Sequence, residues 1–332
     1  MKHFVKSALA GLTALAAVGT AFSGSALAKQ EIIFGISAKT GSLQALTATE
    51  FMNRANAKLG DTAEVKLFDS SQLGKDKDLM QKLKLGTVHL ALPSSIMSSI
   101  SDEFALFDMP FLVADRAHVA RIEEEIFWPQ IAATVEDDGY KVLAVWENGV
   151  RHITNNVRPI NVPADLAGIK IRTPKSTWRV KMFSEWGANP TPMGFSEVFT
   201  GLQTGVIDGQ ENPYTNIDAA KLNEVQKYLS KTGHVYTPSY PTMGKAFYDS
   251  LDPEIRTVLE ETARELALWA REQGEAADGA LRKKLVDAGM IYNEADRAAF
   301  VEASKPIYEA FGSEVNGGKE MIEKAISLAG NS

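Results

Sequence analysis

The residues best suited to chemistry in this chain lie between Ile169 and Pro213, and the chemistry they suit is the binding of a small anion. Arg172 follows the apolar Ile171, a pattern that predicts a strand with a cation at its end. A guanidinium can hold a carboxylate through two parallel hydrogen bonds, which the ammonium group of a lysine cannot do. Asn212 precedes a proline, so its backbone is restricted to extended geometry and its amide can be held in a fixed direction.

Each of these residues also has a structural explanation. Arg172 could form an internal ion pair with Glu211 or Asp208, and for this arginine we weigh the two explanations equally. Arg151 presents the same choice, and on the residue alone we favour the structural role. An Asn-Pro pair is more often simply a turn. An aromatic residue on a helix, such as Phe195, is more often part of the core.

The chain contains none of the sequence patterns of common catalytic sites. It has no nucleophile elbow, no zinc-protease motif, no phosphate-binding loop and no dinucleotide fingerprint. Its five histidines are scattered and lack metal-ligand spacing. Glu147, Asp208 and Glu211 could in principle include a glycosidase pair, but acidic residues in turns are usually solvated. We therefore predict a protein that is not an enzyme and that uses no metal and no cofactor.

Composition indicates a globular protein without a nucleic-acid partner. The 332 residues are enough for two domains, and 45% of them are hydrophobic. The net charge of −7 argues against nucleic-acid binding, because phosphate groups require a basic face. The absence of cysteine excludes disulfides and thiolate chemistry. Nothing indicates an assembly helix, so we expect a monomer.

The first 28 residues have the organisation of a signal peptide. Lys2 and Lys6 give a positive start, and residues 8–18 form an apolar segment shorter than the ~20 residues that a membrane span needs. The triplet Ala26-Leu27-Ala28 is a cleavage site of the small-residue type. We expect cleavage after Ala28, export to the periplasm and a mature chain that begins at Lys29.

The segments that must position the candidate residues alternate between strand and helix patterns. Such alternation predicts an α/β fold with a mostly parallel sheet covered by helices. Ligands bind these sheets in the loops at the carboxyl ends of strands, and Ser37, Asp76 and Ser94 lie in or next to such loops. The predicted elements are strands over 31–37, 64–68 and 88–92 and helices over 45–59, 76–85 and 116–135.

A second α/β unit is predicted from about residue 152. A strand over 141–146 is expected to break at Glu147-Asn148-Gly149, and a strand over 152–156 to cross into the second unit. Segment 169–208 then repeats the strand–helix pattern. The string from Asp208 to Pro213 is interpreted as a polar turn.

One long helix is predicted after Leu251. Asp252 is a suitable N-cap, Pro253 suits the first helical position, and an apolar stripe continues to Gly289. Such a helix would be on the order of 50 Å long, which exceeds one small domain. We therefore expect it to pack across both units and tie them together. Two further helices are predicted within residues 293–329.

Seven segments, taken in their order along the chain, resemble the sequences of the extracytoplasmic solute-binding proteins of TRAP transporters. The resemblance runs over essentially the whole mature chain. The strings are DSSQLG (69–74), FDMPFL (107–112), WENGVRHITNN (146–156), ADLAGIKIRTP (164–174), GANPTPM (187–193), FSEVFTGLQTGVIDGQENP (195–213) and EVQKYL (224–229). The resemblance implies a two-lobed fold like that of periplasmic binding proteins, with crossover hinge strands, a ligand between the lobes and a long helix that spans both. We accordingly assign 29–150 plus 238–277 to the first lobe and 151–237 plus 278–332 to the second.

The resemblance also implies roles for individual residues. Arg172 would pair with the substrate carboxylate, supported by Asn212 and Arg151, and Phe195 would form an apolar floor. The positions expected to face the ligand from elsewhere are Ser37, Asp76 and Ser94, followed by Lys175 and Ser239. Ser94 stands where sialic-acid-binding relatives carry an acidic residue, which speaks against sialic acid.

The expected function is therefore capture of an organic acid, a sugar acid or a C4-dicarboxylate, and its delivery to integral-membrane subunits of a TRAP transporter. A periplasmic receptor that senses the same acid for a membrane kinase is one alternative. A secreted carbohydrate-acid hydrolase or lyase is another.

Overall fold

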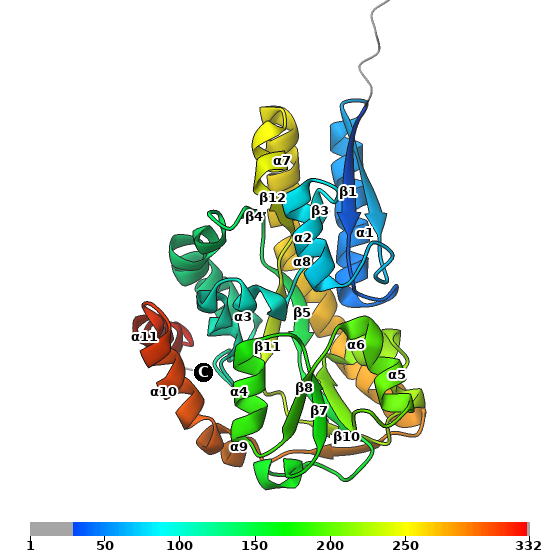
Figure 1. Cartoon of the computed structure of the whole chain (residues 1–332), viewed down its shortest axis with the longest axis vertical. Helices are drawn as coiled ribbons and strands as arrows, with labels where there is room; N and C mark the ends of the chain where they lie inside the picture. Colours follow the sequence, from blue (N-terminus) through cyan, green and yellow to red (C-terminus); the bar gives the residue numbers. More distant parts are fainter. Residues whose placement is uncertain (1–28, 331–332) are drawn as a thin grey trace, which may run out of the picture.

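The computed structural model describes residues 29–330, which form two lobes joined by a pair of strands and a long helix (Figure 1). The predicted signal peptide, residues 1–28, lies outside the described residues. Among residues 29–330 no helix combines the length and the apolar composition that crossing a bilayer requires.

The first lobe is built on a five-stranded sheet in the order β2-β1-β3-β12-β4. β1 is parallel to β2 and β3, whereas β12 is antiparallel to both of its neighbours. The sheet is thus mixed rather than mostly parallel, because one strand arrives from a distant part of the chain. Its strands are β1 (Gln30–Gly35), β2 (Ala63–Phe68), β3 (Leu90–Ala91), β4 (Tyr140–Val142) and β12 (Thr242–Gly244).

Helices α1 (Leu43–Leu59), α2 (Asp76–Leu85) and α7 (Lys245–Ser250) belong to this lobe. α1 begins where the Ser42 side chain accepts a hydrogen bond from the backbone N–H of Ala45 and ends at Gly60, as the sequence predicts to within two residues. Phe51 on α1 packs edge-on against Phe34 of β1, with ring centroids 5.9 Å apart. This contact fixes the helix over the apolar face of the sheet.

The second lobe contains a six-stranded sheet in the order β13-β10-β6-β9-β7-β8. The edge strand β8 carries Pro190 and Pro192. Proline has no backbone N–H to donate, and an edge strand tolerates this because it needs hydrogen bonds to a neighbouring strand on one side only. The strands are β6 (His152–Asn155), β7 (Lys170–Thr173), β8 (Asn189–Pro192), β9 (Gly209–Asn212), β10 (Tyr228–Lys231) and β13 (Ile291–Glu294). The helices of this lobe are α4 (Thr177–Glu185), α5 (Val198–Gln203) and α6 (Tyr214–Ala219), with short turns η5 (Pro163–Leu166), η6 (Phe195–Glu197) and η7 (Leu222–Glu224).

Strand β9 corrects the prediction of a polar turn over 208–213. Its residues are all buried, and β9 pairs with β6 on one side and β7 on the other. Gly209 is required there, because a Cβ at this position would overlap the carbonyl oxygen of Thr154 and lie 2.7 Å from the Cβ of Asn155. The strand is polar because each of its side chains finds a buried partner, which single-sequence patterns do not reveal.

The lobes are connected by the antiparallel pair β5 (Trp146–Val150) and β11 (Tyr236–Ser239). The predicted break at residues 147–149 is therefore wrong, and β6 lies within the second sheet while β5 makes the crossing. Gly149 allows the strand to continue, because its φ of +131° and the close approach of Pro213, 2.9 Å from a Cβ placed there, exclude other residues. The pairing slips at Thr237 and Pro238, which bends the ribbon between the lobes.

Helix α8 (Pro253–Asp287) has the predicted start, with the Asp252 carboxylate accepting from the N–H of Glu254. It contacts α1 of the first lobe, the crossover strand β5 and α6 of the second lobe, so it spans both lobes as expected (Figure 1). Gly274 lies where α8 passes β5. The buried Glu147 carboxylate of β5 occupies the space that a Cβ on Gly274 would need, and Arg116 fixes that carboxylate through hydrogen bonds of 2.7 and 2.9 Å.

The segment between β3 and β4 consists of η1 (Ser95–Ser99), η2 (Asp102–Asp108), α3 (Arg116–Ile122), the π-helical η3 (Glu123–Ile131) and η4 (Ala132–Val135). A single helix over 116–135 was predicted. Instead the helix widens to a π-helix at η3, where Pro129 cannot donate a backbone hydrogen bond.

After α8 the chain forms β13 and three helices rather than the two predicted: α9 (Arg297–Ala303), α10 (Lys305–Glu314) and α11 (Gly318–Leu328). α11 packs on α3, where His118 Nε2 lies 2.7 Å from the carbonyl oxygen of Ala325. The C-terminal segment therefore contacts both predicted lobes, and the predicted lobe boundaries stay a prediction.

The two glycines of α8 generate a matched prediction. Gly274→Ala should lower the free energy of unfolding by about 1–3 kcal/mol, because the new methyl group overlaps a carboxylate that Arg116 holds in place. Gly279→Ala should raise it by about 0.5–1 kcal/mol, because a Cβ at that exposed helical position meets nothing within 4 Å. Urea unfolding of both variants measures the difference, and equal effects would contradict this account of α8.

Candidate functional site

A cavity of about 220 Å³ lies between the two lobes. It is smaller than the ~300–1,000 Å³ typical of sites for drug-sized molecules, so it suits a small ligand. Its walls come from the loops after β1 and β3, the start of α2, the crossover strand β5 and the ends of β7 and β9. The lining residues are Ser37, Ala38, Gln44, Lys75, Asp76, Lys77, Asp78, Leu92, Ser94, Ser95, Ile96, Asn148, Arg151, Arg172, Pro174, Lys175, Met193, Gly194, Phe195, Asn212 and Asn216.

Arg172 reaches this cavity from the carboxyl end of β7 and is 3% exposed. Its Nε and Nη2 donate to the carbonyl oxygen of Met193, at 3.0 and 2.7 Å, which fixes the plane of the guanidinium. The ring of Phe195 lies 5.8 Å from its Cζ. Nη1 has no hydrogen-bond partner among residues 29–330. The group is therefore oriented by the protein but leaves donors available.

The Arg172 guanidinium lies within 4 Å of no carboxylate in the described part of the chain. Burial lowers its pKa to about 10, and the nearby charge of Arg151 acts in the same direction while Glu211 opposes it. Arg172 nevertheless remains protonated at neutral pH. Both partners considered from the sequence are engaged elsewhere, because Asp208 accepts from the backbone N–H of Lys170 at 2.9 Å and Glu211 binds two other arginines.

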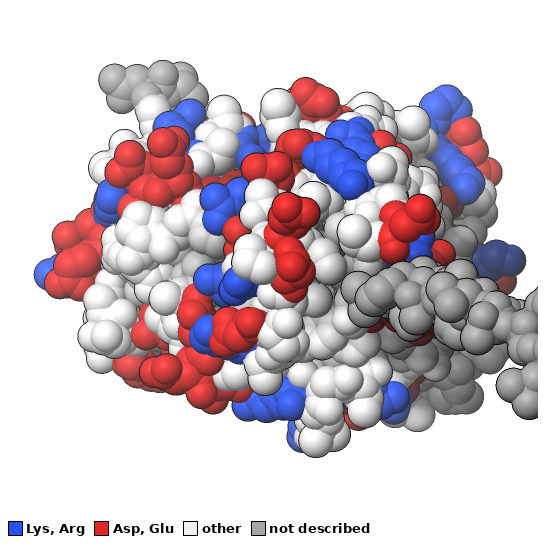
Figure 2. All heavy atoms as spheres, turned by 90° about the horizontal axis from the view of Figure 1, so that it is seen from above, with Lys and Arg blue, Asp and Glu red and all other residues white. Residues whose placement is uncertain are grey.

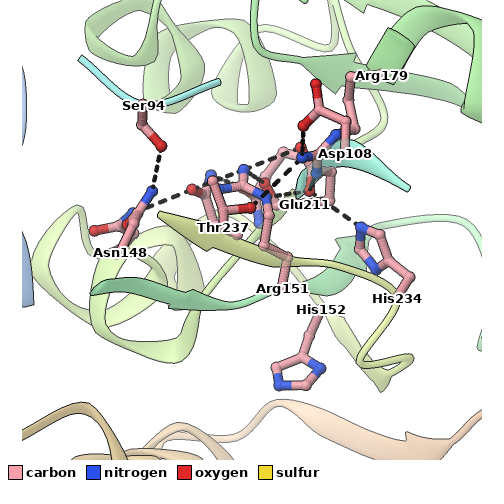
Figure 3. A network of polar contacts seen from close by, with 12 residues as sticks. Ser94, Asp108, Asn148, Arg151, His152, Arg179, Glu211, His234 and Thr237 are labelled. Carbon is pink, nitrogen blue, oxygen red and sulfur yellow. Dashed lines mark hydrogen bonds and ion pairs between the residues drawn. The ribbon is translucent and has the colours of Figure 1, made fainter. Parts of the chain in front are cut away.

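Glu211 is the centre of a buried polar network (Figure 3). It pairs with Arg151 through both carboxylate oxygens, with Arg179 at 2.9 Å and with His234 Nε2 at 3.1 Å. Burial alone would raise the pKa of the Glu211 carboxyl, but the guanidiniums of Arg151 and Arg179 outweigh it and hold the pKa well below its ordinary value. Glu211 is therefore ionised and fully committed to these partners.

Asp108 extends the network from η2 to α4. Its Oδ1 accepts from Arg179 Nη2 at 2.6 Å, and its Oδ2 accepts from the hydroxyls of Ser98 and Ser176, at 3.0 and 2.7 Å. Figure 3 shows Asp108 and Arg179 meeting Glu211 on the side away from Asn148. Three buried guanidiniums, of Arg151, Arg172 and Arg179, thus lie near two buried carboxylates, and Arg172 is the one that forms no ion pair with either.

Asn212 lies at the carboxyl end of β9, with its side chain set by three neighbours. One amide hydrogen donates to Gln210 at 2.6 Å, and its oxygen accepts from Arg151 and Asn216 at 3.1 and 3.2 Å. An amide nitrogen carries two hydrogens, so the second remains for a ligand. Arg151 combines the two roles that the sequence left open: its charge is neutralised by Glu211, and it also lines the cavity.

The structure brings eight of the nine predicted site residues to this cavity. Ser37 donates to Asp76. Ser94 bridges the crossover strands by donating to the carbonyl oxygen of Pro238 at 2.6 Å and accepting from Asn148 at 3.2 Å. Lys175 is exposed at the rim. Ser239 is the exception, because it is fully buried on β11 and lies outside the lining.

Several residues of the site were missed from the sequence. Arg179 lies on the buried face of α4 together with Met182 and Phe183. In the sequence, the spacing of Arg179 from these apolar residues places it on the same helical face, which could have indicated that this arginine has a buried partner. Gln44 and Asn216 line the cavity from α1 and α6 and carried no such signal. Lys75 pairs with Glu197 at 2.9 Å, joining the two lobes at the rim of the cleft.

Charges elsewhere on the surface are mixed in sign. In the view from above, basic and acidic side chains are interspersed (Figure 2). Within residues 29–330 no three His, Asp or Glu side chains are placed to hold a metal ion together. In the described part of the chain, this cavity thus combines a buried cation that forms no ion pair with hydrogen-bond donors that have no partner.

Residues 34–314 match the family described as bacterial extracellular solute-binding protein, family 7. Over 311 residues the chain is 35% identical to the 2,3-diketo-L-gulonate-binding periplasmic protein YiaO of Escherichia coli K12, covering 91% of this chain and 93% of that protein. A TRAP periplasmic solute-binding protein from Polaromonas sp. JS666, bound to D-erythronate, is similar with a TM-score of 0.86 and 30% identity, over 91% of this chain and all of that one. One from Sulfurospirillum deleyianum, with bound succinate, has a TM-score of 0.85 and 29% identity, over 91% and 100% of the two chains.

The buried histidines generate a prediction about pH. Burial lowers the pKa of His234 to about 4 and that of His152 to about 3, whereas in the unfolded chain both are near 6.5. The unfolded state therefore binds more protons at pH 5, and the free energy of unfolding should fall as the pH drops from about 6.5 towards 4. In His234→Gln, the loss of stability between pH 7.5 and pH 5 should be smaller by about 2 kcal/mol.

Thr232→Val is the control for this measurement. It removes the hydrogen bond to His234 Nδ1, 2.7 Å long, without removing the titrating group. Urea unfolding at the two pH values should show the wild-type pH dependence in Thr232→Val. A wild-type pH dependence in His234→Gln as well would show that His234 is not the group responsible.

Proposed function

The chain belongs to family 7 of the bacterial extracellular solute-binding proteins, a family of binding receptors and not of enzymes, and from that premise we propose how it captures its ligand. It binds a small organic acid, a sugar acid or a C4-dicarboxylate, with the acid's carboxylate on Arg172. It then delivers the acid to the integral-membrane subunits of a TRAP transporter. The predicted signal peptide would place it in the periplasm.

One observation carries this proposal: Arg172 is a buried, oriented cation with no carboxylate partner among the described residues. Removing a guanidinium from water is costly unless it is paired. In the unliganded protein, the cost of removing Arg172 from water is already part of the free energy of the folded state. A carboxylate that binds therefore forms the ion pair without any further desolvation cost for the arginine. Arg172 therefore supports a site that is complete only when an anion is bound.

The remaining contacts at this end of the cavity suit a carboxylate. The free Nη1 of Arg172 and the second amide hydrogen of Asn212 supply donors, and Arg151 holds the Asn212 oxygen so that its nitrogen faces the ligand. The ring of Phe195 packs over Arg172 and limits access of water to the pair. We propose these four residues as the carboxylate subsite.

The rest of the predicted set would contact other parts of the ligand. Ser37, Asp76, Ser94 and Lys175 line the cavity and can do so directly. Ser239 lies behind the cavity wall, and its buried hydroxyl has no partner in the described structure. Ser239 would contribute indirectly, by supporting the neighbouring strand.

Closure of the lobes would complete binding. The ligand stabilises a closed form only through contacts that it makes better there than in an open form. The Lys75–Glu197 ion pair already joins the rims of the two lobes across the cleft. Because closure excludes water, it lowers the local dielectric constant and strengthens the pair between Arg172 and the carboxylate.

Replacement of Arg172 tests the proposal directly. Titration calorimetry against a panel of sugar acids and dicarboxylates should identify a ligand, and Arg172→Ala should then weaken its binding by about 3–5 kcal/mol, because the carboxylate loses its partner. A micromolar ligand has only about 8 kcal/mol in total. Arg172→Lys should also bind weakly, since a point charge replaces the planar fork.

The matched control is Arg158→Ala, which removes an exposed arginine outside the cavity lining. It should bind like the wild type. Urea unfolding of ligand-free Arg172→Ala should show a loss of stability much smaller than its loss of binding, because this arginine has no ion pair in the protein. Near-normal affinity in Arg172→Ala would refute the carboxylate subsite.

A further inference from the structure

An ion pair joins the two lobes at the rim of the cavity. Lys75 is the residue that precedes α2 in the first lobe, and Glu197 is the last residue of η6 in the second. Lys75 Nζ lies 2.9 Å from Glu197 Oε1, and the two side chains are 44% and 46% exposed. A motion that moves the lobes apart at this rim must separate the two groups. The pair is therefore placed to oppose opening of the cleft.

Both members of the pair are held in position by their surroundings. The second carboxylate oxygen of Glu197, Oε2, accepts from the backbone N–H of Gly194 at 3.1 Å, which leaves Oε1 for the lysine. The backbone N–H of Lys75 donates to Asp78 at 3.2 Å at the start of α2. The Lys75 side chain also passes close to the second lobe, because a Cβ placed on Gly194 would lie 3.2 Å from its Cδ. Surface ion pairs are weakened by the entropy of fixing two long side chains, and these contacts reduce that cost.

One short segment, between β8 and α5, connects the ion pair to the carboxylate subsite. At its start, the carbonyl oxygen of Met193 accepts both hydrogen bonds from Arg172. In its middle, the ring of Phe195 lies 5.8 Å from Cζ of the same arginine. At its end, Glu197 reaches Lys75. An acid that binds Arg172 in the proposed way therefore acts on the segment that carries Glu197, so that ligand binding and the rim contact can support each other.

Lys75 has one alternative role, because it also lines the cavity and could contact the ligand itself. Glu197 lies outside the cavity lining. The hydrogen bond from Lys75 holds the pKa of the Glu197 carboxyl below its ordinary value, so this carboxylate is ionised at neutral pH. A change at Glu197 therefore tests the ion pair without removing a group that faces the ligand.

We propose that Lys75 and Glu197 form a latch that holds the two lobes together around a bound acid and slows its release. The inference rests on the proposed function, since an acid on Arg172 must first bring the lobes together. The latch closes only after the acid has entered the cleft, so it acts on the rate of dissociation and hardly on the rate of association. Because exposed ion pairs contribute modestly to stability, the expected change in the rate of release is a few-fold.

Release of a radiolabelled acid, chased with an excess of the same unlabelled acid, measures the latch. D-erythronate, galactonate and succinate are tried first, followed by the rest of the panel of sugar acids and dicarboxylates. Glu197→Gln keeps an oxygen that can accept from the N–H of Gly194 but loses the charge. This variant should release the acid about 2–5-fold faster than the wild type, with a nearly unchanged rate of association.

Salt and an exchange of charges separate a latch from a merely structural contact. Raising the salt concentration from about 0.02 M to about 0.5 M should accelerate release from the wild type, because salt screens an exposed ion pair, and should affect Glu197→Gln less. Glu197→Lys places two like charges together and should release the acid faster than Glu197→Gln. Adding Lys75→Glu to Glu197→Lys restores opposite charges and should slow release again towards the wild-type rate.

Glu294→Gln is the matched control. It breaks an exposed ion pair with Lys231, 3.2 Å long, whose lysine and glutamate side chains are 44% and 58% exposed. This pair joins β10 to β13 within the second sheet and does not cross the cleft. The variant should therefore keep the wild-type rate of release and its dependence on salt.

The outcomes separate this inference from the proposed function. An unchanged rate of release in Glu197→Gln, with a normal thermal unfolding curve, would overturn the latch. So would a charge-exchanged double variant that releases the acid no more slowly than Glu197→Lys, or an effect confined to the rate of association, which would mean that Lys75 guides the acid into the cleft instead. Each of these results leaves the proposed function intact as long as binding depends on Arg172. Failure of every acid to bind would overturn the proposed function and the latch with it.

Discussion

The structure depends on an imbalance of charge that the protein maintains in its interior. Arg151, Arg172 and Arg179 are buried near Glu211 and Asp108, so three cations share two anions. Glu211 and Asp108 are held by the first and last of these arginines and by hydroxyl donors, which leaves Arg172 as the group without a partner. No carboxylate among residues 29–330 forms an ion pair with Arg172. The negative charge that pairs with Arg172 must come from a bound ligand. This requirement makes the cavity selective for an anion.

The same network connects parts of the chain that are far apart in the sequence. Asp108 comes from the segment after β3, Arg179 from α4 and Glu211 from β9, while His234 lies two residues before the crossover strand β11. The charged groups that shape the binding site therefore also brace the junction between the lobes. Ser94 and Asn148 continue this connection to the cavity wall by linking β5, β11 and the loop after β3. Binding and lobe geometry thus rest on shared contacts, which is the condition for a ligand to favour one arrangement of the lobes.

Much of the fold followed from local patterns. The start of α8 was predicted from Asp252 and Pro253, because capping is decided by residues within one turn. α2 has the predicted bounds for the same reason. The errors fell where long-range contacts override local signals: β9 has a turn-like sequence but is a central strand, and Glu147 to Gly149 continue a strand because β11 pairs with them. The first sheet is mixed because β12 is added antiparallel from a distant segment, and the second is mixed because β6 runs antiparallel to β9 and β10.

The sequence by itself determined which residue types could grip a carboxylate, and it located Arg172 and Asn212 at the ends of their elements. It could not determine whether Arg172 was already neutralised, because a guanidinium and a carboxylate that are distant in the sequence meet only through the packing of sheets and helices. Only the tertiary structure assigned Glu211 to Arg151 and Arg179 and left Arg172 free. It also brought Gln44 to the cavity, since a neutral amide on a helix carries no pattern that distinguishes it from a solvated one. Residue type sets the possible chemistry, and the three-dimensional distribution of partners decides which group remains to perform it.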